Sequence, residues 1–188
     1  MSAQQATKKK PNRSSRWSAR QLATMALFTA LGLILSFIEF PLLPGTDFLK
    51  FDASQVTALV CGLSYGPAAG SIVGVAVAWI HALFTGQFWG ALMNTGVCLA
   101  FILPASFAYK RSQSTVAIIV GLVVSSICAV VVALIMNIVI TPIYMGVPVD
   151  VVVGMILPIL LPFNILKALI CSVLSFIFIK SLKSFIKK

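Results

Sequence analysis

The sequence predicts an all-α, polytopic membrane protein with six transmembrane helices in one bundle. Of its 188 residues, 60% are hydrophobic and 10% are charged, whereas roughly a quarter of the residues of a soluble domain are charged. The apolar residues form runs of the length that crosses a bilayer, about 20 residues at about 1.5 Å of rise each. The basic residues flank these runs, where Lys and Arg set the topology of a membrane protein.

The apolar runs divide into six predicted helices at Pro, Gly and charged residues. Gly66-Pro67 separates the second helix from the third, because Pro cannot continue the helical hydrogen-bond ladder through its own position. Thr141-Pro142 is expected to stop the fifth helix for the same reason. Residues 1–16 are expected to be a disordered basic segment, and residues 17–188 one membrane domain. The predicted helices cover residues 22–40, 54–65, 67–85, 88–109 and 115–140, and the last begins between residues 156 and 162 and ends near Lys180.

The charges support six helices. With six, both termini and the turn containing Lys110 and Arg111 lie on one side, which then holds twelve of the fourteen basic residues. The positive-inside rule makes that side cytoplasmic, so both termini are expected in the cytoplasm. All four acidic residues fall on the other side: Glu39, Asp47, Asp52 and Asp150.

Several functional classes are excluded by composition and motif. The net charge of +10 does not indicate nucleic-acid binding, because the basic residues flank apolar runs and do not form a stripe on a folded surface. The four cysteines lie singly in apolar runs with one histidine in the chain, so no metal site is expected. The chain has no phosphate-binding loop, no H-E-x-x-H and no paired carboxylates, and we expect no enzyme activity.

The polar residues of the predicted helices gather near the outer face. Arg20 and Glu39 are nineteen residues apart, about 28 Å of helix, so Glu39 lies at the outer boundary of the hydrocarbon. The inner halves contain almost nothing more polar than Ser, Thr or Cys. This asymmetry indicates an outward-opening pocket and not a relay of ionisable groups across the membrane. The other polar residues in the outer portions of helices are Asn94, Asn137, Asn164 and Lys167.

Lys167 is the most informative of these residues, because a lysine within a span costs about 2.5–3.5 kcal/mol unless it is paired, hydrated or snorkelling. It either extends outward to Glu39 or Asp52, or donates to a ligand together with Asn164, which shares its helix face. Asn94 and Asn137 fit ligand contact and interhelical hydrogen bonding equally well. His81 is expected to be structural. The aromatic residues at this level, Phe48, Phe51, Phe88 and Trp89, fit either an interfacial belt or the wall of a site for a planar ligand.

Two small-residue spacings predict close helix contacts. Gly70 and Gly74 on the third helix are expected to pack inside the bundle. Ala26 and Ala30 on the first helix fit either internal packing or the docking of a partner protein near its basic end.

Three stretches resemble the substrate-binding S components of energy-coupling-factor (ECF) vitamin transporters, most closely the riboflavin-specific type. They are FPLLPGTDFLKFDASQVTALVCGLSYGPAAG (residues 40–70), MNIVITPIY (136–144) and LPFNILKALI (161–170). The first helix adds the alanine-spaced ALFTALGLI (26–34), which is similar to the motif such proteins use against their coupling subunit. The resemblance extends over about residues 18–183.

This resemblance implies capture of riboflavin as a transported ligand, without a cofactor, in a bacterial plasma membrane. Delivery would require a membrane coupling protein and two cytoplasmic ATPase subunits, with Ala26 and Ala30 facing the coupling protein. The loop of residues 41–52 would gate the pocket. The third helix reads VAVAWIHAL where such proteins often carry a Lys-Asn pair, which leaves another vitamin, of pantothenate or pyridoxine type, as the alternative; a membrane enzyme is less expected. The residues implied to contact the ligand are Asn137, Asn164 and Lys167, then Asn94, Thr46 and Phe48, with Glu39 at the outer boundary.

Overall fold

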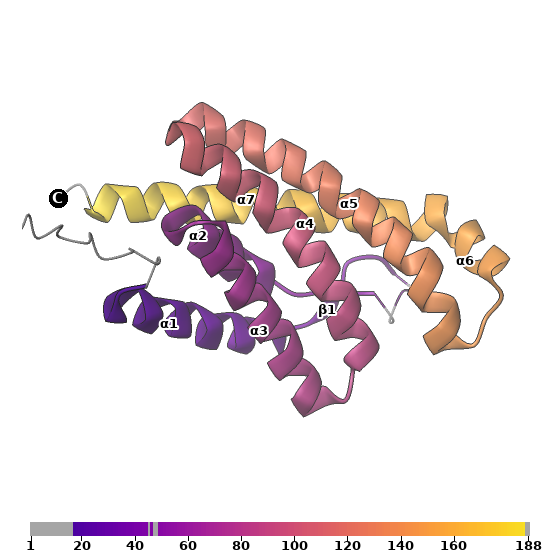
Figure 1. Cartoon of the computed structure of the whole chain (residues 1–188). Coiled ribbons are helices and arrows are strands. Elements are labelled where there is room, and N and C mark those ends of the chain that lie inside the picture. Colours follow the sequence, from indigo (N-terminus) through magenta and orange to yellow (C-terminus); the bar gives the residue numbers. More distant parts are fainter. Residues whose placement is uncertain (1–16, 45, 47–48, 187–188) are drawn as a thin grey trace, which may run out of the picture.

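The computed structural model describes residues 17–44, 46 and 49–186, with side chains described as far as residue 181. The predicted disordered segment, residues 1–16, lies outside this range. Within it the chain is a bundle of helices with one small hairpin of two strands (Figure 1). The all-α prediction is confirmed. The elements are α1 (Ala19–Ser36), β1 (Phe40–Pro41), β2 (Lys50–Phe51), α2 (Ser54–Tyr65), α3 (Pro67–Thr85), α4 (Phe88–Ser112), α5 (Thr115–Met145), α6 (Val149–Met155), the π-helical segment η1 (Ile156–Leu160) and α7 (Leu161–Ile186).

Five stretches of helix in the described part of the chain are long and apolar enough to cross a membrane: α1, α3, α4, α5 and the continuous rod from Val149 to Ser181. The short second helix, α2, has twelve residues, of which ten are buried, and spans only about 18 Å. It lies inside the bundle in contact with α1, α3, α4 and α7. It is therefore a core helix that the longer helices surround.

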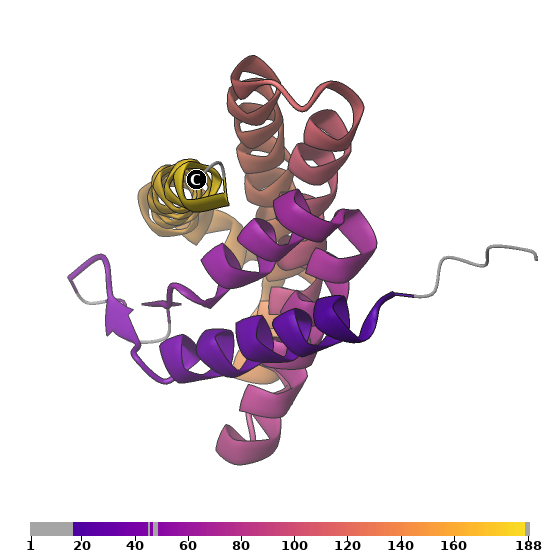
Figure 2. The same ribbon diagram turned by 90° about the vertical axis from the view of Figure 1, so that its left-hand side faces the viewer.

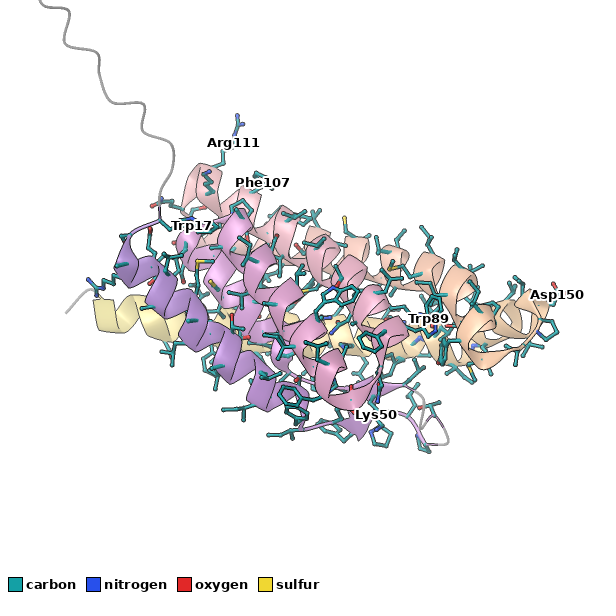
Figure 3. The ribbon with its side chains drawn as sticks, turned by 60° about the horizontal axis from the view of Figure 1, so that its bottom comes forward. Trp17, Lys50, Trp89, Phe107, Arg111 and Asp150 are labelled. Carbon is teal, nitrogen blue, oxygen red and sulfur yellow. The ribbon has the colours of Figure 1, made fainter. Side chains whose placement is uncertain are left out.

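The two ends of the bundle differ in charge as the topology predicted. In Figure 1 the start of α1, the α4–α5 turn and the end of α7 lie at the left, and α6 lies at the right. Figure 3 shows Arg111 and Asp150 at opposite ends of the molecule. Exposed large apolar side chains cover the sides between these ends, as expected for a surface that faces lipid.

Small residues allow the helices to approach closely. A Cβ atom on Gly70 would lie 2.6 Å from the Cα of Gly62, and one on Gly74 would overlap the Sγ of Cys98. The prediction that Gly70 and Gly74 pack inside the bundle is thus confirmed. Figure 2 shows α4 and α5 running side by side, and on that contact a Cβ on Gly121 would meet α4 backbone at 2.9 Å. Ala26 and Ala30, by contrast, are exposed, so internal packing does not explain them.

Several predicted helix boundaries were wrong by a few residues, and the differences at the first, fifth and last helices have clear causes. The first helix ends at Ser36, because the following residues enter the hairpin in which Phe40 pairs with Phe51. The fifth helix continues through Pro142 to Met145, where Gly146 in the left-handed conformation ends it; a proline removes one hydrogen bond and need not end a helix held in lipid.

The last helix starts earlier than predicted, at Val149. Its two prolines do not interrupt it. Pro158 lies within η1, whose wider turn accommodates the missing donor, and Pro162 lies in the first turn of α7. A helix inside a membrane protein tolerates proline where local π-helical turns of this kind satisfy the freed backbone groups.

Candidate ligand-binding site

A cavity of about 510 Å³ opens among the hairpin, α3, α4, α5 and α7. Its size falls within the range of about 300–1,000 Å³ that is usual for small-molecule sites. Five of the seven residues predicted to contact a ligand line it, from four separate parts of the chain: Glu39, Asn94, Asn137, Asn164 and Lys167. The depth of each residue along its predicted helix was therefore enough to predict that these residues lie close together.

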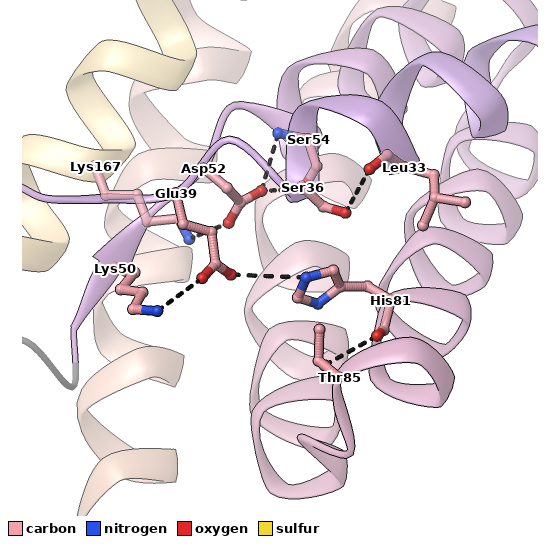
Figure 4. A network of polar contacts seen from close by, with 9 residues as sticks. All are labelled: Leu33, Ser36, Glu39, Lys50, Asp52, Ser54, His81, Thr85 and Lys167. Atoms are coloured by element: carbon pink, nitrogen blue, oxygen red, sulfur yellow. Dashed lines mark hydrogen bonds and ion pairs between the residues drawn. The ribbon is translucent and has the colours of Figure 1, made fainter.

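Lys167 is held inside the cavity by an ion pair. Its Nζ lies 3.3 Å from Oδ2 of Asp52, and the two side chains are only 14% and 11% exposed (Figure 4). The other carboxylate oxygen, Oδ1, accepts hydrogen bonds from the backbone N–H of Ser54, at 3.0 Å, and from its hydroxyl. Both interpretations of Lys167 thus have a basis, because it pairs with Asp52 and also lines the cavity.

Asp52 lies in the connection between β2 and α2, outside the spanning helices. Burial alone would raise the pKa of this carboxyl, but the Lys167 ammonium and the hydrogen bonds from Ser54 outweigh burial and lower it. Asp52 is consequently charged at neutral pH.

Asn94 receives a hydrogen bond that the sequence did not predict. Nε2 of Gln55 donates to Oδ1 of Asn94 at 2.7 Å. Gln55 lines the cavity as well and is only 4% exposed. The available signal was that Gln55 is the only carboxamide in the short helix, but nothing in the sequence placed α2 against α4 at this level.

Asn137 and Asn164 each donate one N–H to their own helix. Nδ2 of Asn137 bonds to the carbonyl of Ala133 at 2.8 Å, and its Oδ1 accepts from the Thr141 hydroxyl at 3.0 Å. Nδ2 of Asn164 bonds to the carbonyl of Leu160 at 2.7 Å. Each carboxamide is thereby oriented, and a carboxamide has two N–H donors and an oxygen, so capacity for a ligand remains.

A second set of charges lies at the mouth of the cavity. Glu39 is 3.2 Å from Nζ of Lys50 and 3.8 Å from Nε2 of His81 (Figure 4). The His81 ring also lies 5.0 Å from that of Phe37, which fits the structural role expected for this histidine. Phe88 and Trp89 complete the wall here, each about half exposed.

The two predicted loop contacts have different outcomes. Thr46 is 3% exposed, its hydroxyl donates to the carbonyl of Leu43 at 2.7 Å, and it is not among the residues that line the cavity. Its side chain is directed into the loop, and ligand contact by Thr46 stays a prediction. Phe48 lies outside the described residues.

The chemistry of this cavity suits an uncharged small molecule. Glu39 is paired with Lys50 and Asp52 with Lys167, so the charges on the wall largely cancel. Carboxamides, aromatic rings and aliphatic side chains supply most of the rest of the wall. Among the residues that the structure describes, no three His, Cys, Asp or Glu side chains cluster in a way that could hold a metal ion. The fold and the site together define a membrane-embedded small-molecule-binding protein.

Comparison with known proteins identifies the family. The family model for the substrate-specific component of ECF transporters matches residues 20–179, and the chain belongs to this family. A solved structure described as the S component of a bacterial ECF transporter has a TM-score of 0.80 and 30% sequence identity, covering 90% of this chain and 98% of its own. The family is one of transport components and not of enzymes.

Curated relatives add a substrate name. The chain is similar to riboflavin transporter RibU of Staphylococcus aureus, with 32% identity over 106 residues, and to riboflavin transporter FmnP of Bacillus subtilis, with 29% identity over 109 residues. The matches cover 56% of this chain in both cases, and 56% and 57% of the relatives. The chain thus spans about half the length of the curated relatives it matches.

Proposed function

We propose that this chain is the riboflavin-binding subunit of an ECF importer. One observation carries the proposal. Four polar residues from three helices line a single cavity of suitable size: Asn94, Asn137, Asn164 and Lys167. Hydrogen-bonding groups beside Phe88 and Trp89 suit a flat, uncharged ring system that is rich in carbonyl and nitrogen acceptors. The names of the relatives support riboflavin as that ring system.

Lys50 and Trp89, which line the cavity, lie away from the end of the bundle that carries Arg111 (Figure 3). With the basic end in the cytoplasm of a bacterial cell, the cavity would receive its ligand from outside. Delivery would then depend on a membrane coupling protein and two cytoplasmic ATPases. The exposed alanines of α1, Ala26 and Ala30, support docking of the coupling protein there, because small residues allow close helix contact in lipid.

Detergent-purified protein tests the substrate directly. We expect it to carry a flavin absorption band, or to quench the fluorescence of added riboflavin with saturation. A colourless protein that leaves riboflavin fluorescence unchanged would exclude the proposal. A thermal-shift panel with riboflavin, pantothenate and pyridoxine then distinguishes the vitamins, since a ligand that binds only the folded state raises its melting temperature. A shift with pantothenate or pyridoxine alone would favour the alternative that the Lys-Asn departure in α3 leaves open.

A further inference from the structure

Residues 52–55, which run from the β2–α2 connection into the first turn of α2, contact two walls of the cavity at once. Asp52 reaches Lys167 on α7, at 3.3 Å. Gln55, three residues further on, reaches Asn94 on α4, at 2.7 Å. One segment of four residues therefore determines where two predicted ligand contacts, on two different helices, place their polar groups.

Asp52 and Gln55 are themselves buried. Asp52 is 8% exposed and Gln55 is 4% exposed. Ser54 fixes the Asp52 carboxylate through its backbone N–H and its hydroxyl. The Asp52 carboxylate cannot shift without breaking buried hydrogen bonds, which are costly to leave unmade, and the burial of Gln55 confines its side chain.

The residues they contact depend more on a partner for their position. Lys167 carries its ammonium on a flexible four-carbon stem, and the carboxylate of Asp52 holds that ammonium in one place and compensates its charge. For Asn94, the bond from Gln55 occupies Oδ1, which leaves the N–H donors of the carboxamide for other partners.

We infer that Asp52 and Gln55 are positioning residues of the ligand pocket, with Asp52 acting through Lys167 and Gln55 through Asn94. This rests on the proposed function and extends it to the chemistry that the pocket recognises. The pair presents N–H donors from Asn94 and a charge-compensated ammonium from Lys167. Such a wall selects an uncharged ligand edge that carries hydrogen-bond acceptors, such as ring carbonyls and imine-type nitrogens.

A crossed double-mutant cycle on riboflavin affinity tests the assignment, with Asp52→Asn, Gln55→Leu, Lys167→Gln and Asn94→Ala made singly and in pairs. Asp52→Asn should weaken binding about tenfold when Lys167 is present and hardly at all in Lys167→Gln. Gln55→Leu should likewise weaken binding several-fold, but not in Asn94→Ala. The crossed pairs, Asp52 with Asn94 and Gln55 with Lys167, should instead multiply their separate effects, because these residues do not touch.

This pattern separates positioning from a general structural role. Damage to the fold would weaken binding in every background alike and would lower the melting temperature of the ligand-free protein in step with affinity. Equal losses in all backgrounds therefore overturn the inference. Asp150→Asn, which removes an exposed carboxylate remote from the cavity, is the matched control and should leave affinity unchanged.

Failure of the proposed function and failure of the positioning inference give different results. If wild-type protein fails to bind riboflavin, the proposed function fails; if it binds and the cycles show no coupling, only the positioning inference fails. Should Asp52→Asn not be recovered folded, or Lys167→Gln not bind measurably, the Gln55–Asn94 cycle decides alone: coupling supports the inference and its absence refutes it.

Discussion

Replacing Lys167 by Met should destabilise the protein through the carboxylate that it leaves behind. Met retains most of the length and apolar volume of the side chain, so packing changes little. Asp52, however, keeps its buried position without a compensating charge, and breaking a buried ion pair on one side costs about 3–5 kcal/mol. Protonation of Asp52 limits that cost: taking up a proton at pH 7 costs a carboxyl of ordinary pKa about 4 kcal/mol.

The sign of the pH dependence follows from this limit. In wild-type protein the pKa of Asp52 is lowered, so the ion pair contributes its full stability above the ordinary carboxyl pKa and loses it only in more acid solution. In Lys167→Met the pKa of Asp52 should instead be raised, because burial, the largest influence on this carboxyl, is then opposed only by the hydrogen bonds from Ser54. The deficit of the variant should then shrink by about 1.4 kcal/mol for each unit that the pH falls between 7 and 5.

The buried cysteines provide the assay. Cys61, Cys98 and Cys171 are free and buried, so a thiol-reactive fluorophore labels them only as the protein unfolds on heating. The melting temperature of Lys167→Met should be clearly below that of wild type at pH 7 and closer to it at pH 5. Adding Asp52→Asn should restore much of the stability without restoring riboflavin binding.

Lys50 supplies the matched control for this experiment. It also pairs with a carboxylate, Glu39, but its side chain is 49% exposed, and exposed pairs contribute only about 0–1 kcal/mol. Lys50→Met should therefore melt close to wild type at both pH values. A loss in Lys167→Met that is no larger than in Lys50→Met, or that grows as the pH falls, would refute the reasoning.

Three further variants test other parts of the structure. Gly70→Ala should lower the melting temperature by an amount corresponding to about 1–3 kcal/mol, because its Cβ would lie 2.6 Å from backbone; Gly154→Ala, which meets nothing within 4 Å, should not. Ala30→Trp should leave riboflavin binding intact and abolish co-purification with the coupling protein. The control Ile127→Trp, at another exposed position, should affect neither. Asn137→Ala should weaken riboflavin binding about tenfold in fluorescence titration, and it should also lower the melting temperature, because it leaves the buried Thr141 hydroxyl without its acceptor; unchanged affinity would remove Asn137 from the site.

The site was predictable as far as helix position determines it. Asn164 and Lys167 are three residues apart, so any helix through them puts both on one face. Asn94 and Asn137 could be placed because a spanning helix converts residue number into depth at about 1.5 Å per residue. These relations need only the local backbone conformation, and all four residues line the cavity.

The partners of those residues were only partly predicted: Asp52 was one of two carboxylates expected near Lys167, whereas the bond from Gln55 to Asn94 was missed. Gln55 bonds to Asn94 across 39 residues of sequence and Asp52 to Lys167 across 115. Such contacts depend on how α2 packs among its neighbouring helices, and the hydropathy of a sequence carries no information about that packing. The hairpin was missed for a related reason, because two residues per strand are too few to show an alternating pattern.

The position of the cavity explains why capture alone cannot complete transport. Its floor reaches Val97 of α4, and the next turns of that helix towards the Arg111 end carry Phe101 and Ile102, which are at most 1% exposed. Close contacts such as Gly62 against Gly70 fill the same inner region. A ligand held by Lys167 thus has no opening towards that end in the described structure. Release on the far side requires movement either of the whole bundle or of the hairpin next to Asp52, and movement of the hairpin would strain the buried ion pair between Asp52 and Lys167. Energy for that step has to come from outside this chain, which is consistent with a family of components that work beside other subunits.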